Sequence, residues 1–221
     1  MSADTPPDPD QYAQQLARQA RAAGSATAWF DDLYAASEQG AAVVPWDRGG
    51  PHPLLQAWVH ERAPDGRGLR ALVVGTGPGH DAELLADLGY ATTAFDISPT
   101  AVQAARARFP ASAVDYQVAD LLALPADWDL SFDLVVEIFT VQSLPPELRS
   151  EATAAVRRVV APGGTLLVVA FVSDSSVEDG PPWPLTGTDL EAFAVDGLSR
   201  VGSALSDQGR SRVEFRRQEE G

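Results

Sequence analysis

The chain has 221 residues, and its 31 Asp and Glu side chains outnumber its 16 basic ones, which gives a formal net charge of −15. Every basic residue is Arg and the sequence holds neither Lys nor Cys, so disulfides, cysteine-based zinc sites, cysteine nucleophiles and lysine Schiff bases are excluded. Because so acidic a chain repels phosphate backbones and anionic lipids, we expect neither nucleic-acid nor membrane partners.

The N-terminal part predicts a tail followed by helices. Residues 1–10 are rich in Pro and Asp and are expected to be a disordered tail, with Asp8 as the cap of the first helix. Because no strand pattern precedes Leu69, residues 11–66 are expected to form a helical lid on a domain made of residues 67–221. The predicted helices span residues 9–23, 25–40 and 53–63.

From Leu69 onward, short apolar runs alternate with helical segments. Runs that are apolar on both faces are typical of parallel strands covered by helices on both sides, so the predicted class is α/β, a doubly wound sheet. Near the C-terminus, Thr188 to Glu191 matches a capping box that would open a last helix. The predicted strands span residues 69–74, 91–96, 114–119, 132–138 and 165–172, with helices at 80–88, 99–109 and 146–160 and candidate edge strands at 198–205 and 211–217.

A glycine-rich turn follows the first predicted strand directly. Gly75, Gly77 and Gly79 stand where a strand turns into a helix, and glycines there let the chain turn sharply and let a ligand approach the backbone. Asp96 ends the second strand, where a carboxylate can accept hydrogen bonds from both ribose hydroxyl groups of a nucleoside. Together these features predict a nucleoside-binding site.

A nicotinamide-dependent dehydrogenase shares both features, but three further details favour a different nucleoside. Ser98 and Pro99 open a helix right behind the acid that ends the second strand. Asp120 ends the third strand, where an acid can reach an adenine amino group. The segment 161–164, APGG, breaks the chain just before the apolar fifth strand.

With these details, residues 69–172 resemble a class I S-adenosylmethionine-dependent methyltransferase. The resemblance implies a Rossmann-like methyltransferase sheet, mostly parallel with an antiparallel edge strand, and S-adenosyl-L-methionine as the cofactor. It places the glycine loop under the methionine part of the cofactor, Asp96 on the ribose, and the residues after the second and third strands around the adenine. The cofactor-binding residues so implied are Gly75, Thr76, Gly77, Gly79, Asp96, Ile97, Asp120 and Leu121.

One position departs from the pattern of that family. An acid usually stands two residues before the first glycine, and here that position is Val73. The resemblance then implies another partner for the ammonium group of the cofactor, and Asp81 and Glu137 are the candidates. For Asp81, the alternative is that the acid simply favours the N-terminus of its helix.

A narrower resemblance lies upstream of the first strand. The segment 45–53, PWDRGGPHP, is similar to the thiopurine S-methyltransferase and thiol or halide methyltransferase branch, although Ile138 replaces an Arg that is typical of the thiopurine enzymes. The resemblance implies that Trp46 borders the cofactor. Other aromatic residues would close the pocket, or would be ordinary core at helical spacing, which is the preferred interpretation of Phe30. The lid candidates are Trp29, Phe30 and Tyr34, and the other matching segments are residues 79–90 and 132–149.

The segment after the fourth strand bears on the methyl acceptor. Methyltransferases of nucleobase or glutamine amino groups usually carry Asn-Pro-Pro-aromatic there, whereas residues 137–140 read EIFT. We therefore expect a small-molecule acceptor, either a thiol or chalcogen or a phenolic or quinol hydroxyl, facing the loop from residue 173 to 187. No catalytic residue is predicted, because His60 is expected at the surface and a general-base role is disfavoured for His52 and for His80.

Two other functions stay open from the sequence. The chain could bind S-adenosylmethionine or its demethylated product, S-adenosylhomocysteine, without transferring methyl, because Val73 replaces the usual acid. A nicotinamide-dependent oxidoreductase is disfavoured, since no second nucleotide-binding half follows the fourth strand. The sequence shows no signal peptide and no apolar run long enough to cross a membrane, so we expect a cytoplasmic monomer or homodimer without a bound metal.

Overall fold

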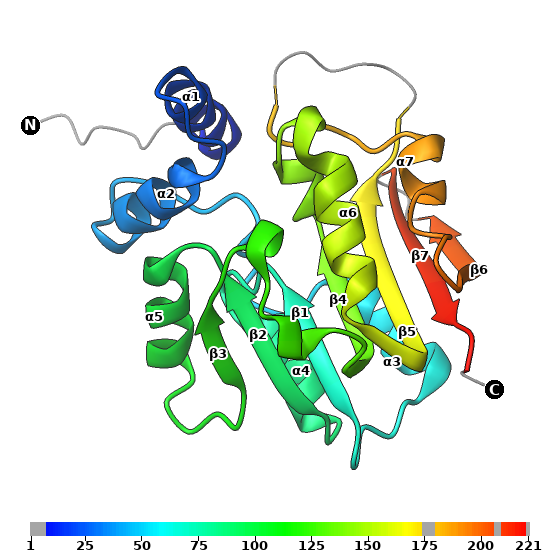
Figure 1. Ribbon diagram of the computed structural model, residues 1–221. Coiled ribbons are helices and arrows are strands. Elements are labelled where there is room, and N and C mark those ends of the chain that lie inside the picture. Colours follow the sequence, from blue (N-terminus) through cyan, green and yellow to red (C-terminus); the bar gives the residue numbers. More distant parts are fainter. Residues whose placement is uncertain (1–7, 174–179, 206–208, 220–221) are drawn as a thin grey trace, which may run out of the picture.

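The structure is a computed structural model that describes residues 8–173, 180–205 and 209–219. Within these ranges, a seven-stranded sheet has the order β3-β2-β1-β4-β5-β7-β6. Strands β1 to β5 run parallel, and β7 runs antiparallel to both of its neighbours, so the predicted doubly wound α/β class is confirmed (Figure 1). The strands are β1 (Arg70–Val74), β2 (Ala91–Asp96), β3 (Asp115–Val118), β4 (Phe132–Ile138), β5 (Val160–Phe171), β6 (Leu198–Leu205) and β7 (Arg210–Arg217).

Helices cover both faces of the sheet. Successive side chains of a strand point to opposite faces, so Leu72 and Val74 of β1 join the apolar cluster of α6, whereas Ala71 and Val73 join that of α3, α4 and α5. Burial of both faces explains why β1 reads as a continuous apolar run. The helices are α1 (Pro9–Ala22), α2 (Ala28–Glu38), α3 (Pro53–Arg62), α4 (His80–Asp87), α5 (Pro99–Arg108), α6 (Arg149–Arg158) and α7 (Gly187–Glu191).

The first three helices do not form one unit. In Figure 1, α1 and α2 lie above α5, near the upper ends of β1 to β3, whereas α3 lies behind the sheet. Leu55 and Trp58 of α3 belong to one apolar cluster with Val73 and Leu167 of the sheet. Helices α1 and α2 build a separate cluster, to which α5 contributes Ala101. We therefore limit the proposed lid to α1, α2 and the segment 39–52 that links α2 to α3, and we call this part the roof.

The predicted tail and last helix need correction. Asp8 caps α1 by accepting a hydrogen bond from the backbone N–H of Gln11, so the helix already includes part of the predicted tail, while residues 1–7 lie outside the described residues. The capping box stands at Thr186 and Asp189, where each side chain accepts the other's backbone N–H. The prediction of a box from Thr188 to Glu191 was therefore wrong by two residues.

Two boundaries around β4 and β5 also differ from the prediction. Strand β5 starts at Val160 rather than 165, because Val160 pairs with Phe132 before the register shifts across the segment 161–164. The helix expected from residue 146 begins as a separate 3₁₀ turn at Pro146–Leu148, and α6 follows it. No helix among the described residues is both long and apolar enough to span a membrane.

Candidate functional site

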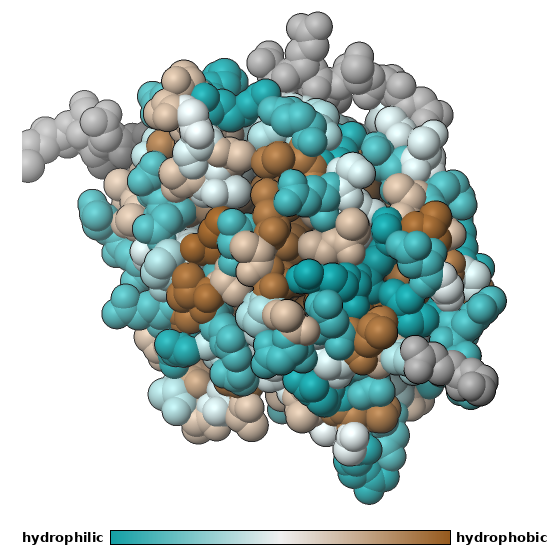
Figure 2. Space-filling view, in the orientation of Figure 1, coloured by the Kyte–Doolittle hydropathy of each residue, from teal (hydrophilic) through white to brown (hydrophobic). Residues whose placement is uncertain are grey.

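A cavity opens where the strand order reverses. From β1 the chain proceeds outward through β2 and β3, while β4 leads to β5 on the other side, so the loops after β1 and β4 diverge and leave a crevice. These loops line the cavity from below and the roof lines it from above. Figure 2 shows apolar residues gathered near the middle of this face, over the region between α2 and α6. The predicted site residues in the lining are Trp46, Gly75, Thr76, Gly77, Asp81, Asp96, Ile97, Asp120 and Leu121.

The glycine loop after β1 forms the floor of the cavity with Gly75, Thr76 and Gly77. Gly75 has φ +65°, and a Cβ built there would lie 2.4 Å from Oγ1 of Thr140. At Gly77, a Cβ would lie 3.0 Å from the hydroxyl of Tyr34 in the roof. Between the two glycines, Oγ1 of Thr76 is buried without a hydrogen-bond partner among the described residues. The two glycines therefore let Thr140 and Tyr34 pack closely on the loop, and Thr76 brings a hydroxyl group without a partner to the lining.

Asp96 is buried at the end of β2 and holds this loop in place. Its Oδ2 accepts a hydrogen bond from the backbone N–H of Gly77 at 3.0 Å, and its Oδ1 accepts one from Ser98 N–H at 3.0 Å. Burial raises the pKa of the carboxyl to about 6, although both hydrogen bonds oppose the rise. Each oxygen keeps a further lone pair, so the carboxylate can still accept hydrogen bonds from a ligand in the cavity.

Hydrogen bonds connect α2 of the roof to the start of α5, next to Asp96. Oδ1 of Asp31 accepts hydrogen bonds from the hydroxyl of Ser98 at 2.6 Å and from the backbone N–H of Thr100 at 3.1 Å. Burial opposes the ionisation of Asp31, but these hydrogen bonds outweigh it and lower the pKa of the carboxyl. Ser98 thus joins two acids, because its backbone donates to Asp96 and its side chain donates to Asp31.

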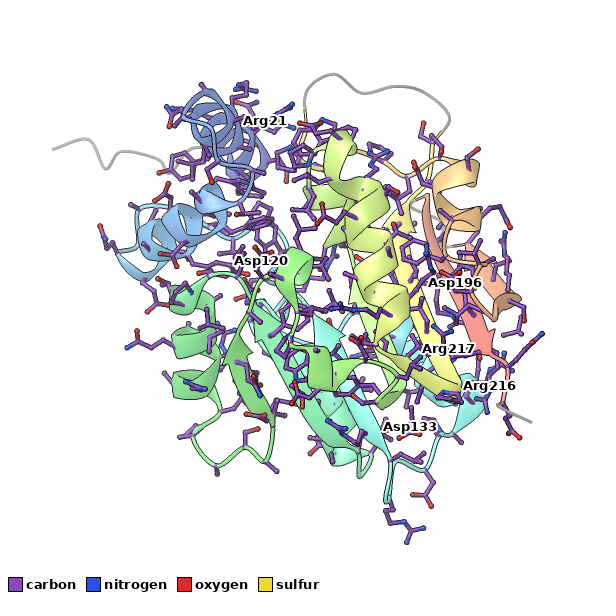
Figure 3. The ribbon with its side chains drawn as sticks, in the orientation of Figure 1. Arg21, Asp120, Asp133, Asp196, Arg216 and Arg217 are labelled. Atoms are coloured by element: carbon purple, nitrogen blue, oxygen red, sulfur yellow. The ribbon has the colours of Figure 1, made fainter. Side chains whose placement is uncertain are left out.

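A second roof contact crosses to the far side of the cavity. Arg21 of α1 forms an ion pair with Glu147 at 3.1 Å, and its guanidinium lies 5.6 Å from the centre of the Trp183 ring. In Figure 3, Arg21 stands on α1 above the sheet, and Asp120 lies lower, between α2 and the strands. The roof therefore also contacts the segments that follow β4 and β5, on the other side of the cavity.

Trp46 is the central aromatic residue of the roof. Its Nε1 donates a hydrogen bond to the Tyr34 hydroxyl at 2.7 Å, and its ring meets those of Trp29 and Phe30 edge-on, at centroid distances of 6.1 and 6.4 Å. Trp46, Tyr34 and Phe30 line the cavity, whereas Trp29 is 1% exposed and lies behind them. Phe30, which was expected to be ordinary core, is only partly buried and borders the cavity instead.

Of the two candidate partners for an ammonium group, only Asp81 lines the cavity. Its Oδ1 accepts a hydrogen bond from the backbone N–H of His52 at 2.7 Å, and burial raises the pKa of its carboxyl to about 6. A bound cation favours the ionised form of a neighbouring acid, so a ligand cation here would reverse that shift. The lining holds Val73 where the family usually has an acid, so the role of Asp81 toward an ammonium group stays a prediction.

Two predicted residues, Gly79 and Glu137, lie outside the lining. A Cβ at Gly79 would lie 2.7 Å from the hydroxyl of Tyr116, so this glycine permits the close packing of α4. Oε1 of Glu137 accepts a hydrogen bond from Val141 N–H at 2.9 Å, and its Oε2 is buried without a hydrogen-bond partner among the described residues. Burial raises the pKa of Glu137 to about 7. Cofactor roles for both residues stay predictions.

We expect Glu137→Gln to stabilise the protein in a pH-dependent way. The raised pKa means that the stability which Glu137 contributes is full below its unfolded pKa near 4.5 and is lost as the pH rises through about 7. Gln keeps an oxygen for Val141 N–H and carries no charge. The free energy of unfolding should therefore exceed that of the parent by about 1–3 kcal/mol at pH 8 and by roughly nothing at pH 4.

Urea unfolding at both pH values measures this difference, and Glu151→Gln on the exposed side of α6 is the matched control. An equal gain at pH 4 and pH 8 would contradict the assigned cause. A loss of affinity for S-adenosylmethionine in Glu137→Gln would instead support the role that the resemblance implies for this residue.

Among the polar lining residues that the sequence did not assign to binding are His52 and Gln142. His52 is the cap of α3, and its Nδ1 accepts a hydrogen bond from Leu54 N–H at 3.2 Å. Burial, together with the charges of Arg48 and Arg210, lowers the pKa of the imidazole to about 4. Both residues lie in segments that carry the narrower resemblance, residues 45–53 and 132–149. The position of His52 between two prolines was the one signal that marked it as a cap.

None of the three histidines, all of which the structure describes, offers a basic nitrogen to the cavity. Nδ1 of His52 is engaged by Leu54 N–H, so its Nε2 carries the proton of the neutral ring. Nε2 of His80 lies 3.8 Å from an oxygen of Asp47, and the ring lies outside the lining. His60 is exposed on α3. A histidine general base is therefore not part of this site.

The end of the cavity beyond the glycine loop is walled by aromatic rings. Phe139 and Phe171 stack with centroids 5.1 Å apart and an interplanar angle of 12°, and His52 meets Phe139 edge-on at 5.3 Å. Pro181 and Pro182 complete this wall. They belong to the predicted acceptor loop from residue 173 to 187, of which residues 174–179 lie outside the described residues. This end of the cavity is therefore mainly apolar and aromatic.

Comparison with known proteins agrees with this geometry. Residues 71–164 match the family model described as a methyltransferase domain. The chain is 29% identical over 201 residues to a 2-heptyl-1-hydroxyquinolin-4(1H)-one methyltransferase of Mycobacteroides abscessus, with 84% of this chain and 87% of that protein covered. It is also 29% identical over 184 residues to a probable thiol methyltransferase 2 of Arabidopsis thaliana, with 79% and 78% covered.

Among solved structures, the fold is similar to that of the 1,6-didemethyltoxoflavin-N1-methyltransferase of Burkholderia thailandensis, which was determined with bound 1,6-didemethyltoxoflavin and S-adenosylhomocysteine. The TM-score is 0.66 at 17% sequence identity, and the match covers 98% of this chain and 94% of that one. At this identity the likeness concerns the fold, and it extends over the roof as well as the sheet.

Proposed function

Since this chain is a class I S-adenosylmethionine-dependent methyltransferase, as its sequence predicted, we propose that it methylates a hydroxyl oxygen on a small, planar aromatic acceptor. The observation that carries the proposal is the stacked pair of rings, Phe139 and Phe171, at the end of the cavity beyond the glycine loop, which we call the slot. Small-molecule sites are typically lined by apolar and aromatic side chains, and an aromatic ring offers a flat face to a planar ligand.

The floor of the cavity fits S-adenosyl-L-methionine, which supplies a methyl group bound to a positively charged sulfur. Gly75 and Gly77 line the cavity where the methionine part would lie, and the free hydroxyl of Thr76 can donate to its carboxylate. Asp96 can accept from the ribose, and Asp81 can pair with the ammonium group in place of the acid that Val73 replaces. The lining residues named for the adenine are Ile97, Asp120 and Leu121.

In this proposal the protein positions the two reactants and excludes water, and it does not transfer a proton. Because no histidine base faces the cavity and Asp81 and Asp96 are assigned to the cofactor, we infer that the acceptor hydroxyl is acidic enough to lose its proton to solvent before it reacts. The oxygen lone pair then forms the new bond to the methyl carbon while the bond from that carbon to sulfur breaks, and the electron pair of the broken bond returns to sulfur. Holding the reactants in line can lower such a barrier by about 7–11 kcal/mol.

Oxygen is favoured over sulfur as the attacking atom by one of the relatives. The relative from Mycobacteroides abscessus is named for a hydroxyquinolone. A thiol is the second candidate acceptor, because a thiolate forms readily without a base and one relative is named as a probable thiol methyltransferase.

An acceptor panel tests the proposal. We expect transfer of labelled methyl from S-adenosylmethionine to acidic hydroxylated bicyclic rings, with the ether as product and with little transfer to hydrogen sulfide or halide. Naphthalene-2-thiol and 2-naphthol form a matched pair that differs in the attacking atom. Transfer to thiols alone would favour the second candidate. Cofactor binding by calorimetry without transfer to any acceptor would instead favour a protein that binds the cofactor without catalysis.

A further inference from the structure

Two buried hydrogen-bond donors in the slot have no partner among the described residues. They are Nε2 of His52 and Nε2 of Gln142, on side chains of residues that are 5% and 1% exposed. A buried donor without a partner costs about 1–3 kcal/mol. Both residues line the cavity, so a ligand atom there can satisfy the two donors.

Neighbouring hydrogen bonds fix both groups as donors. Nδ1 of His52 accepts from Leu54 N–H at 3.2 Å, which leaves the proton of the neutral ring on Nε2. Oε1 of Gln142 accepts from the backbone N–H of Phe171 at 2.8 Å, which leaves its amide nitrogen as the free end. Neither side chain can turn its free end into an acceptor without breaking a buried hydrogen bond.

The two donors are attached to the same aromatic wall. The ring of His52 meets Phe139 edge-on at 5.3 Å, and Gln142 is bonded to the backbone of Phe171, the partner of Phe139 in the stack. Arg210 lies over the Phe171 ring at 5.0 Å, and Arg48 belongs to the lining. In a chain with a net charge of −15, this end of the cavity is thus edged with positive charge and donors.

We infer that His52 and Gln142 bind a second oxygen of the acceptor, a ring carbonyl conjugated to the hydroxyl that is methylated. A carbonyl oxygen has two lone pairs and can accept from both donors at once. The reacting oxygen is a poor occupant, because it needs a lone pair for the methyl group and loses its negative charge as it reacts. This assignment rests on the proposed function.

The two residues would then determine specificity between otherwise similar acceptors. A site built to donate hydrogen bonds discriminates strongly against a ligand that lacks the matching acceptor, because its buried donors stay unpaired. We expect kcat/KM for 3-hydroxyquinolin-4(1H)-one to exceed that for 3-hydroxyquinoline, which lacks the carbonyl, by about tenfold or more. The carbonyl compound should gain mainly through a lower KM, because its hydrogen bonds persist through the reaction.

His52→Asn and Gln142→Glu test this inference. Asn is a good helix cap but is too short to reach the position of the His52 Nε2. Glu keeps the oxygen that accepts from Phe171 N–H and removes the amide donor. In each variant the preference for the carbonyl compound should fall to about threefold or less, and comparing ratios between enzymes cancels the different acidities of the two hydroxyls.

The matched control is His60→Asn, an exposed histidine on the same helix, which should keep the full preference. A preference that persists unchanged in His52→Asn and Gln142→Glu overturns the inference and leaves the proposed function standing. If the parent methylates neither compound while it binds S-adenosylhomocysteine normally in calorimetry, the proposed acceptor class fails, and the inference fails with it.

Discussion

Asp96→Ala is expected to lower the affinity for S-adenosylmethionine and S-adenosylhomocysteine by about 100-fold or more. The substitution removes the charged acceptor proposed for the ribose, and hydrogen bonds to a charged group contribute about 1.5–3 kcal/mol each. It also releases Gly77 N–H and Ser98 N–H, the two donors that hold the glycine loop against β2. The fold should persist, because burial already disfavours the charged form of this carboxyl and raises its pKa to about 6.

Isothermal titration calorimetry with S-adenosylhomocysteine measures the loss, and thermal unfolding confirms that the variant is folded. Asp115→Ala is the matched control, since Asp115 is an exposed acid on the neighbouring strand β3. Near-parental affinity in Asp96→Ala would defeat the assignment of this residue to the ribose.

The second large effect is expected from two tryptophans that touch each other but differ in their relation to the cavity. Trp46→Ala should lower kcat/KM by about 100-fold while the protein stays folded, because the ring lines the cavity and orders the roof through its bond to Tyr34. Trp29→Ala should instead lower the free energy of unfolding by about 3–5 kcal/mol, because its ring is 1% exposed and lies behind the lining.

Steady-state kinetics and urea unfolding on both variants separate the two roles. Trp46→Phe is the conservative control, since it keeps a ring in the roof but removes the hydrogen bond to Tyr34. The reverse pattern, with Trp46→Ala unstable at normal specific activity, would make Trp46 a core residue and would remove it from the site.

Much of the sheet could be predicted from the sequence because β1, β2 and β4 are short runs with both faces buried, and such runs carry their own signal. Strand β5 was predicted to start five residues too late. Its first part contains Pro and two Gly, which indicate a break, but the pairing of Val160 with Phe132 extends the strand across them. Tertiary pairing decided this boundary, and no local pattern could have shown it.

The floor of the cavity was more predictable than its walls. The glycine loop and Asp96 follow strands directly, so the order of the strands brings them together at one edge. His52 and Gln142 come from a cap and a 3₁₀ turn, and Gln142 is held by the backbone of Phe171, which is distant in sequence. Such residues have no spacing to recognise, because their environment exists only in the folded chain.

The two hydrogen bonds that Ser98 donates also bear on whether the roof can be exchanged without changing the rest of the protein. Ser98 belongs to the sheet domain, yet its hydroxyl is fixed by Asp31 of the roof, while its backbone fixes Asp96. The roof is therefore not an interchangeable module that could be swapped to alter acceptor choice. A chimera that takes its first two helices from a relative would also need an acid in place of Asp31 to face Ser98. Without it, the exchange would disturb Asp96 and the part of the cavity proposed to bind the nucleoside.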